Sequence, residues 1–120
     1  MSGAYRLDAQ FYETQIDKDW EPNFDDIKSK IKENTKMLVY VNPGNPNCIS
    51  YDTQTIEKFL NLAREHNLVV LADEIYFDSV FPGVQHNSIL DIKGYDDIPI
   101  ILMSGLAKRF VTPGYCCEWL

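Results

Sequence analysis

Three short apolar runs divide the chain, at residues 37–41, 68–72 and 98–103. Each run is wholly or almost wholly apolar and ends at polar or turn-forming residues. Continuous apolar runs of this length are typical of strands buried on both faces of a parallel sheet. The pattern therefore predicts three strands, and the third tolerates Pro99 because this proline lies near the start of its run.

A helical pattern separates the first two runs. Apolar residues recur there with the spacing i, i+3, i+4, i+7, at Ile56, Phe59, Leu60 and Ala63. Asp52 precedes the pattern as a candidate N-cap, and Asn67 follows it as a residue that can close a helix. The spacing predicts a helix that begins after Asp52 and ends at about residue 66.

The first third of the chain has a weaker pattern. Residues 4–12 alternate roughly between apolar and polar types, which favours a strand, and residues 15–22 read as an acidic loop. Asn23 is a good N-cap and is followed by acids and then lysines, in the order that suits the helix dipole. We predict a second helix over residues 24–33.

The order strand, helix, strand, loop, strand indicates an α/β fold with a mostly parallel sheet and flanking helices. The 120 residues suffice for one domain, 1–120, and 45% of them are hydrophobic, as in globular proteins. The net charge of −7 disfavours nucleic acid or an anionic membrane as a partner. No apolar run approaches the roughly 20 residues of a membrane span, and no secretory signal is visible. Cys116 and Cys117 are adjacent and the three cysteines are odd in number, so we expect a reducing, cytoplasmic location.

Chemically versatile side chains follow all three predicted strands. Ligands of parallel α/β sheets gather outside the carboxyl ends of the strands, so Asn45, Asp73, Tyr76 and Lys108 are predicted to converge on one pocket. Each also has an ordinary interpretation: a turn residue, a helix cap, a cover for the core and a solvated basic pair, respectively. Glu74 is interpreted as structural. No metal-ligand spacing is present. The lack of a glycine-rich phosphate loop disfavours an unrelated nucleotide-binding domain.

Three motifs in order change this balance. They are Asn42-Pro43-Gly44-Asn45-Pro46, then Ala72-Asp73-Glu74-Ile75-Tyr76, then Ser104-Gly105-Leu106-Ala107-Lys108-Arg109-Phe110 with Pro113-Gly114-Tyr115. In residues and spacing, the chain closely resembles the fold-type I, pyridoxal-phosphate-dependent aminotransferases of class I and II, above all their tyrosine aminotransferase branch. The resemblance implies that residues 1–120 are part of the large, cofactor-binding domain.

The resemblance also implies a role for each site residue. Lys108 would be the catalytic lysine, which forms the Schiff base with pyridoxal 5′-phosphate and moves a proton. Asp73 would pair with the pyridine nitrogen of the cofactor. Tyr76 and Asn45 would hydrogen-bond its 3-oxygen, and Ser104 would contact its phosphate. The substrates would be an amino acid and a 2-oxo acid.

Three positions depart from the family pattern. Cys116 stands where the family has its phosphate-binding arginine, and Glu118 and Cys48 stand where it has glycine. The parts of the family enzyme that come before and after this slice are also missing. We therefore expect tyrosine-aminotransferase-like transamination to need more than these 120 residues. The alternative is a non-catalytic truncated paralogue or interaction module that pairs with a full-length relative, and a homodimer is a further expectation.

Overall fold

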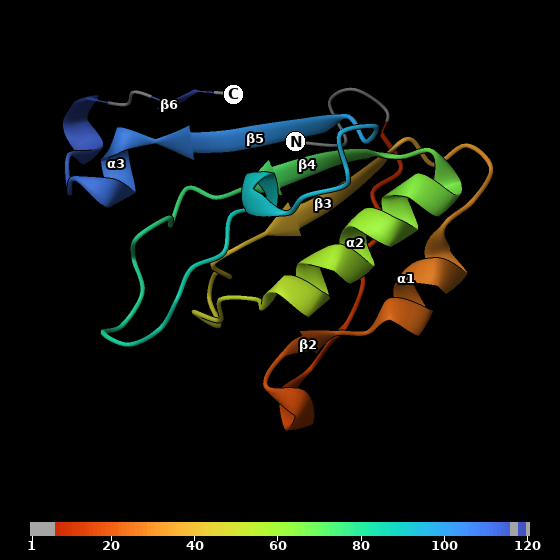
Figure 1. Cartoon of the computed structure of the whole chain (residues 1–120), viewed down its shortest axis with the longest axis horizontal. Coiled ribbons are helices and arrows are strands. Elements are labelled where there is room, and N and C mark those ends of the chain that lie inside the picture. The colour runs from red at the N-terminus through yellow and green to blue at the C-terminus, as the bar shows by residue number, and fades with distance from the viewer. Residues whose placement is uncertain (1–6, 116–117, 120) are drawn as a thin grey trace. The chain divides into compact units, whose positions relative to one another are not determined.

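The computed structural model describes residues 7–115 and 118–119. The chain divides into two compact units, residues 1–34 and residues 35–120, and Figure 1 shows the elements of both. The N-terminal unit contains the antiparallel pair β1 (Thr14–Gln15) and β2 (Glu21–Pro22), joined by the 3-10 turn η2 (Ile16–Lys18), and the helix α1 (Phe24–Lys30). The strand expected over residues 4–12 is wrong for residues 7–12, which form neither strand nor helix.

The exposure of the apolar side chains explains why residues 7–12 form no strand. Leu7 and Phe11 are 66% and 84% exposed, so the alternation marks no buried face. The acidic segment is likewise more than a loop, because it forms most of the small hairpin. The predicted N-cap of α1 is confirmed: the side chain of Asn23 accepts a hydrogen bond from the backbone N–H of Asp26 at 3.1 Å. The helix ends at Lys30, three residues before the predicted end, because Ile31 is extended.

The second unit is built on a four-stranded sheet in the order β3-β4-β5-β6. The first two pairings are parallel, and β5 pairs antiparallel with β6. The strands are β3 (Met37–Val41), β4 (Val69–Asp73), β5 (Ile100–Gly105) and β6 (Glu118–Trp119). The prediction of a mostly parallel α/β fold is confirmed; the second and third strands start one and two residues later than expected, and β6 was not predicted.

The helix α2 (Thr53–His66) covers one face of this sheet (Figure 1). The rings of Tyr40 on β3 and Phe59 on α2 meet edge to face, with centroids 5.2 Å apart, and both side chains are fully buried. The predicted caps are confirmed. The Asp52 carboxylate accepts the Thr55 backbone N–H at 2.8 Å, and Asn67 ends the helix in the left-handed conformation, with φ 53°.

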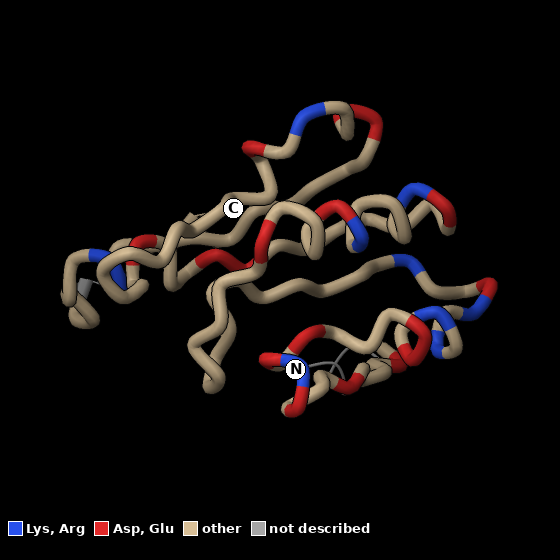
Figure 2. The backbone as a smooth tube through the Cα atoms, turned by 60° about the horizontal axis from the view of Figure 1, so that its bottom comes forward, with Lys and Arg blue, Asp and Glu red and all other residues tan. Residues whose placement is uncertain are grey.

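The opposite face of the sheet is more open than the sequence pattern suggests. Val39, Leu71 and Ile101 lie at one level of the parallel register. Val39 is 46% exposed and Ile101 37%, and Met37 on the same face is 43% exposed. The prediction that the strands are buried on both faces is therefore wrong for this face of the sheet. The exposed side chains Met37, Val39 and Ile101 make this face apolar, and Figure 2 shows where the charged residues lie along the backbone.

Short helices complete the second unit. None of the helices within residues 7–115 and 118–119 combines the length and apolar character needed to cross a membrane. The short elements are η3 (Ile89–Asp91), α3 (Leu106–Arg109) and η4 (Pro113–Tyr115).

Candidate active site

A hollow of about 860 Å³ opens at the carboxyl ends of the parallel strands. Its position follows from the topology, because parallel strands bring their carboxyl ends, and the loops that leave them, to one edge of the sheet. The five residues singled out from the sequence all line it, together with five others. The lining residues are Val41, Asn45, Asp73, Ile75, Tyr76, Met103, Ser104, Lys108, Glu118 and Trp119.

Each of the five comes from a different local setting. Asp73 is the last residue of β4, where its register partners Val41 and Met103 flank it on the two neighbouring strands. Asn45 lies in the turn after β3, Tyr76 in the turn after β4, and Ser104 near the end of β5, while Lys108 lies in α3. The structure thus brings all five to one hollow, and their chemical roles stay predictions.

A hydrogen bond and a cation–ring contact join residues of this group. The side-chain amide of Asn45 donates a hydrogen bond to the Tyr76 hydroxyl oxygen at 3.1 Å. The Lys108 Nζ lies 5.7 Å from the centroid of the Tyr76 ring, a distance at which a cation is attracted to an aromatic face. Because Tyr76 accepts the bond from Asn45, its own O–H remains available to donate to a ligand.

Asp73 is half-buried and shapes the turn that carries Tyr76. Its carboxylate accepts the backbone N–H of Ile75 at 3.1 Å, which bends the chain directly after β4. A carboxylate has further lone pairs, so one bond to the backbone leaves oxygen sites for a ligand in the hollow.

The two neighbouring cations of α3 have different surroundings. Arg109 binds the Asp78 carboxylate at 2.9 Å, and its guanidinium lies 5.2 Å from the Phe77 ring centroid. Lys108 lines the hollow and Arg109 does not. Among the lining residues that the structure describes, Lys108 is therefore the one base, against the acids Asp73 and Glu118.

Sequence reasoning missed the part of the hollow that β6 supplies. Trp119 pairs with Ser104 and Glu118 pairs with Gly105 in the antiparallel register, which brings both to the edge of the site. The two-residue strand carries no periodic signal of its own. Only the unusual acid at a family glycine position marked Glu118 in advance.

Cys48, which stands where the resemblance expects glycine, has an unusual backbone conformation. Its φ is 58°, in the left-handed region that glycine adopts without cost and other residues rarely enter. The turn that contains it is closed by backbone bonds from Gly44 N–H to the Ile49 carbonyl and from Cys48 N–H to the Gly44 carbonyl, at 2.8 and 3.0 Å. Cys48 therefore adopts a backbone conformation that suits glycine better than a residue with a Cβ.

Comparison with known proteins identifies the family. The family model described as "Aminotransferase class I and II" matches residues 3–117. The chain belongs to this family. It is 38% identical over 101 residues to an alanine aminotransferase of Mycobacterium tuberculosis, covering 84% of this chain and 23% of the relative. It is 32% identical over 114 residues to a tyrosine aminotransferase of Mus musculus, covering 95% of this chain and 25% of the relative.

The solved structures agree on the fold. An alanine aminotransferase from Pyrococcus furiosus superimposes with a TM-score of 0.89 at 35% identity, covering 98% of this chain and 29% of the other. The chain thus spans about a quarter of the length of the curated relatives it matches. Fold-type I aminotransferases share the mixed sheet with flanking helices that the structure shows.

The lining residues fit one half of pyridoxal phosphate better than the other. A primary amine, a carboxylate and a hydroxyl–amide pair face the same hollow, as the aldehyde, ring nitrogen and 3-oxygen of the cofactor require. At the phosphate end, Ser104 offers a hydroxyl, whereas the described lining includes no arginine and includes Glu118. Cys116, which the sequence resemblance places at the position of the family's arginine, lies outside the described residues.

Proposed function

We propose that this chain carries the cofactor-binding site of an aminotransferase that uses pyridoxal 5′-phosphate to move an amino group from an amino acid to a 2-oxo acid. The observation that carries the proposal is the gathering of Asn45, Asp73, Tyr76 and Lys108 around one hollow at the strand ends. Family membership supports it. Residues 1–120 would then form part of the large domain.

The chain's own residues divide the work. The cofactor, when bound, supplies an aldehyde that condenses with amines and a ring that accepts electrons. Lys108 would provide the amine for that aldehyde and then take and return the proton at the substrate Cα. Asp73 would hold a proton at the ring nitrogen, because an ionised carboxylate favours a cationic neighbour. Tyr76 would donate to the 3-oxygen, with Asn45 fixing the orientation of its hydroxyl.

The amino-acid substrate is a finer proposal. The motifs favour the tyrosine branch, and the tyrosine aminotransferase of Mus musculus is 32% identical. The alanine aminotransferase of Mycobacterium tuberculosis is 38% identical, so alanine is an equally supported donor. The two side chains differ by a phenol ring, and the donor specificity is measured directly by comparing tyrosine with alanine.

A second candidate is a non-catalytic chain that pairs with a full-length relative. The uncovered apolar face with Met37, Val39 and Ile101 favours it, because such faces are normally covered by another element or chain. Co-expression with a full-length relative distinguishes the two candidates. A stable complex without cofactor binding supports pairing, and cofactor binding by the chain alone supports the first proposal.

The central test is covalent trapping. Incubation with pyridoxal phosphate followed by borohydride should add one reduced cofactor to Lys108, located by peptide mass spectrometry. The Lys108→Ala variant should lose this adduct. The matched control is Lys93→Ala, because Lys93 is exposed and is absent from the lining of the hollow. Labelling that is equal in all three proteins, or scattered over surface lysines, would refute the proposal.

A further inference from the structure

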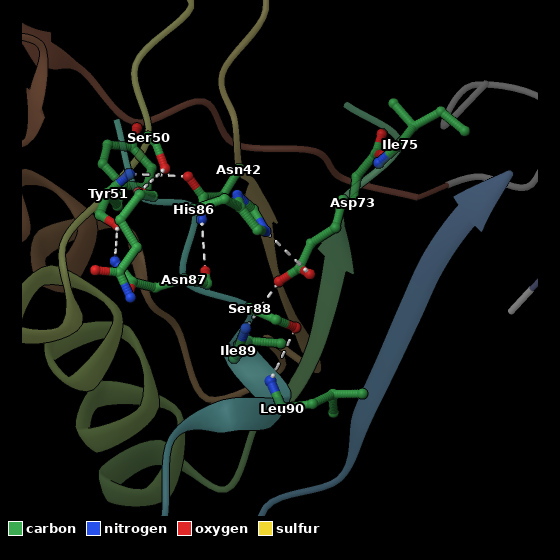
Figure 3. Close-up of polar contacts among 12 residues, drawn as sticks. Asn42, Ser50, Tyr51, Asp73, Ile75, His86, Asn87, Ser88, Ile89 and Leu90 are labelled. Carbon is green, nitrogen blue, oxygen red and sulfur yellow. Dashed lines mark hydrogen bonds and ion pairs between the residues drawn. The ribbon is translucent and has the colours of Figure 1, made fainter. Parts of the chain in front are cut away.

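A buried polar cluster lies beneath the strand ends, on the face of the sheet that α2 covers. Its anchors are Asn42, directly after β3, and Glu74, directly after β4, which are 0% and 2% exposed. Both bind the segment 86–89, which belongs to the long connection between β4 and β5. Figure 3 shows Asn42, His86, Asn87 and Ile89 gathered at this place.

Glu74 holds one end of the segment. Its carboxylate accepts the backbone N–H of Ile89 at 2.8 Å, and its second oxygen lies 3.6 Å from Nε2 of His86. The side chains of Glu74 and His86 are only 3% and 4% exposed, and the His86 ring packs edge to face on Phe77 at 4.7 Å. A carboxylate at such depth is tolerated only with partners, so these contacts fix where the backbone after β4 can lie.

Asn42 holds the other end. Its side-chain amide donates to the Asn87 carbonyl at 3.1 Å, and its side-chain oxygen accepts the Tyr51 N–H at 2.9 Å. The Asn87 side chain in turn donates to the Tyr51 carbonyl at 3.3 Å (Figure 3). The turn between β3 and α2 is thereby closed on the same segment that Glu74 binds.

The two anchors stand close in sequence to the two residues that meet in the hollow. Asn42 precedes Asn45 by three residues, and Glu74 precedes Tyr76 by two. We propose that Glu74 is a positioning residue, which sets the Asn45–Tyr76 hydrogen bond through segment 86–89 and the turn that Asn42 closes. What the bonded pair does to the cofactor rests on the proposed function, whereas the coupling itself does not.

The first experiment needs no ligand. The side-chain amide of Asn45 is observed by NMR, and Tyr76→Phe defines its signal when the hydroxyl partner is gone. Glu74→Ala should move the Asn45 signal in the same direction and reduce the protection of the Ile89 amide against hydrogen exchange. A bond to a charged group accounts for roughly ten- to hundredfold protection.

Two variants control for unfolding and for general damage. Glu74→Gln retains an acceptor for the Ile89 N–H and should restore most of the protection and the Asn45 signal. Ser88→Ala removes another side-chain bond of the same segment, in which the Ser88 hydroxyl accepts the Leu90 N–H at 3.3 Å. It should leave the Asn45 signal unchanged, because Ser88 makes this bond to its neighbour Leu90 and not to a strand end.

The second experiment is a double-mutant cycle with pyridoxal phosphate. The readout is the pH midpoint at which the absorbance of the bound cofactor changes. Tyr76→Phe removes a hydrogen bond to the 3-oxygen and should raise this midpoint by about one unit, which is a tenfold change. Glu74→Ala should raise it in the same direction in the parent chain and hardly at all in Tyr76→Phe, because both act through one hydroxyl.

The outcomes separate the two proposals. If no variant binds the cofactor but Glu74→Ala moves the Asn45 signal, the proposed function fails and the positioning role stands. If the cofactor binds and Glu74→Ala leaves the Asn45 signal unchanged, or adds its full effect to that of Tyr76→Phe, the positioning role is overturned. A Ser88→Ala effect equal to that of Glu74→Ala would overturn it as well.

Discussion

Asp73 and Glu74 are consecutive residues whose carboxylates lie on opposite faces of the sheet. Asp73 lines the hollow with its register partners Val41 and Met103, whereas Glu74 is buried and binds the Ile89 N–H. The alternation of side chains along a strand produces this division. Two adjacent acids can therefore serve as ligand contact and as internal anchor.

Asp73→Asn tests the ligand contact. A neutral amide cannot hold a proton at the ring nitrogen, so the affinity for pyridoxal phosphate should fall roughly ten- to hundredfold. The asparagine oxygen can still accept the Ile75 N–H, so the circular dichroism spectrum and the unfolding midpoint should not change. Asp91→Asn, which removes an exposed acid in η3, controls for the change in net charge. Equal affinity of Asp73→Asn and the parent would contradict the assignment.

Cys116→Arg should strengthen cofactor binding. A phosphate dianion gains a bidentate, charge-assisted contact from a guanidinium, which is expected to raise affinity roughly ten- to hundredfold. Titration with pyridoxal, which lacks the phosphate, provides the comparison and should show no such gain. Glu118→Gln should give a smaller gain that disappears at high salt, because Glu118 is exposed. Tight stoichiometric binding by the parent chain would show that the phosphate is already held.

Cys48→Gly should stabilise the chain by about 1 kcal/mol, because the left-handed conformation costs a residue with a Cβ about this much. The quantity to measure is the free energy of unfolding in urea. Cys48→Ala is the matched control: it also removes the thiol but keeps the Cβ, and should bring no comparable gain. A gain of equal size in both variants would attribute the effect to the thiol instead of the backbone.

The Asp52 cap makes stability depend on pH. The bond from the Thr55 backbone N–H holds the pKa of the Asp52 carboxyl below its ordinary value. The folded state therefore favours the ionised form, so this stabilisation is complete above the pKa of the unfolded chain. It is lost as the pH falls through the lower pKa of the folded chain.

Asp52→Ala should cost about 1 kcal/mol of unfolding free energy at pH 7, and Asp52→Asn much less, since asparagine also caps helices. Urea unfolding over a pH series measures both variants. The difference between the parent and Asp52→Ala should shrink only below about pH 4, near the ordinary pKa of aspartate. A difference that stays constant down to the acid transition would show that the charge of Asp52 does not matter.

The 120-residue chain should transfer no amino group faster than free pyridoxal phosphate, with tyrosine or alanine as donor and 2-oxoglutarate as acceptor. An α-carboxylate needs a cationic anchor to align the Cα–H bond, and Lys108 is the one base in the described lining of the hollow. Coupled assays of the 2-oxo acid products measure the rate. Turnover that Lys108→Ala abolishes would show that the chain is a working enzyme.

Local signals were sufficient to predict the βαβ frame. The positions of β3, α2 and β4 follow from continuous apolar runs, one helical period and the caps Asp52 and Asn67, all of which act over a few residues. The strand prediction failed for residues 7–12 because alternation of apolar and polar residues predicts a strand only where a partner strand and a buried face exist. The antiparallel strand β6 was not predicted, because its pairing with β5 depends on how the chain folds back after α3 and not on its own two residues.

The candidate site also has features that the sequence predicts and features that it does not. Parallel strand order predicts that Asn45, Asp73 and Lys108 meet, and the structure brings them to one hollow. The different surroundings of Lys108 and Arg109 could not be predicted, because the Asp78 partner lies on another loop. The anchoring of Glu74 by residues 86–89 was equally hidden, since a contact across fifteen positions leaves no periodic trace.

The uncovered face of the sheet has a consequence for the behaviour of the chain in solution. Apolar side chains such as Met37, Val39 and Ile101 attract the same side chains of another molecule, and the net charge of −7 opposes close approach at neutral pH. Acidification protonates carboxylates and weakens that repulsion. The chain should therefore stay in solution near neutral pH and aggregate on mild acidification, before its helices unfold.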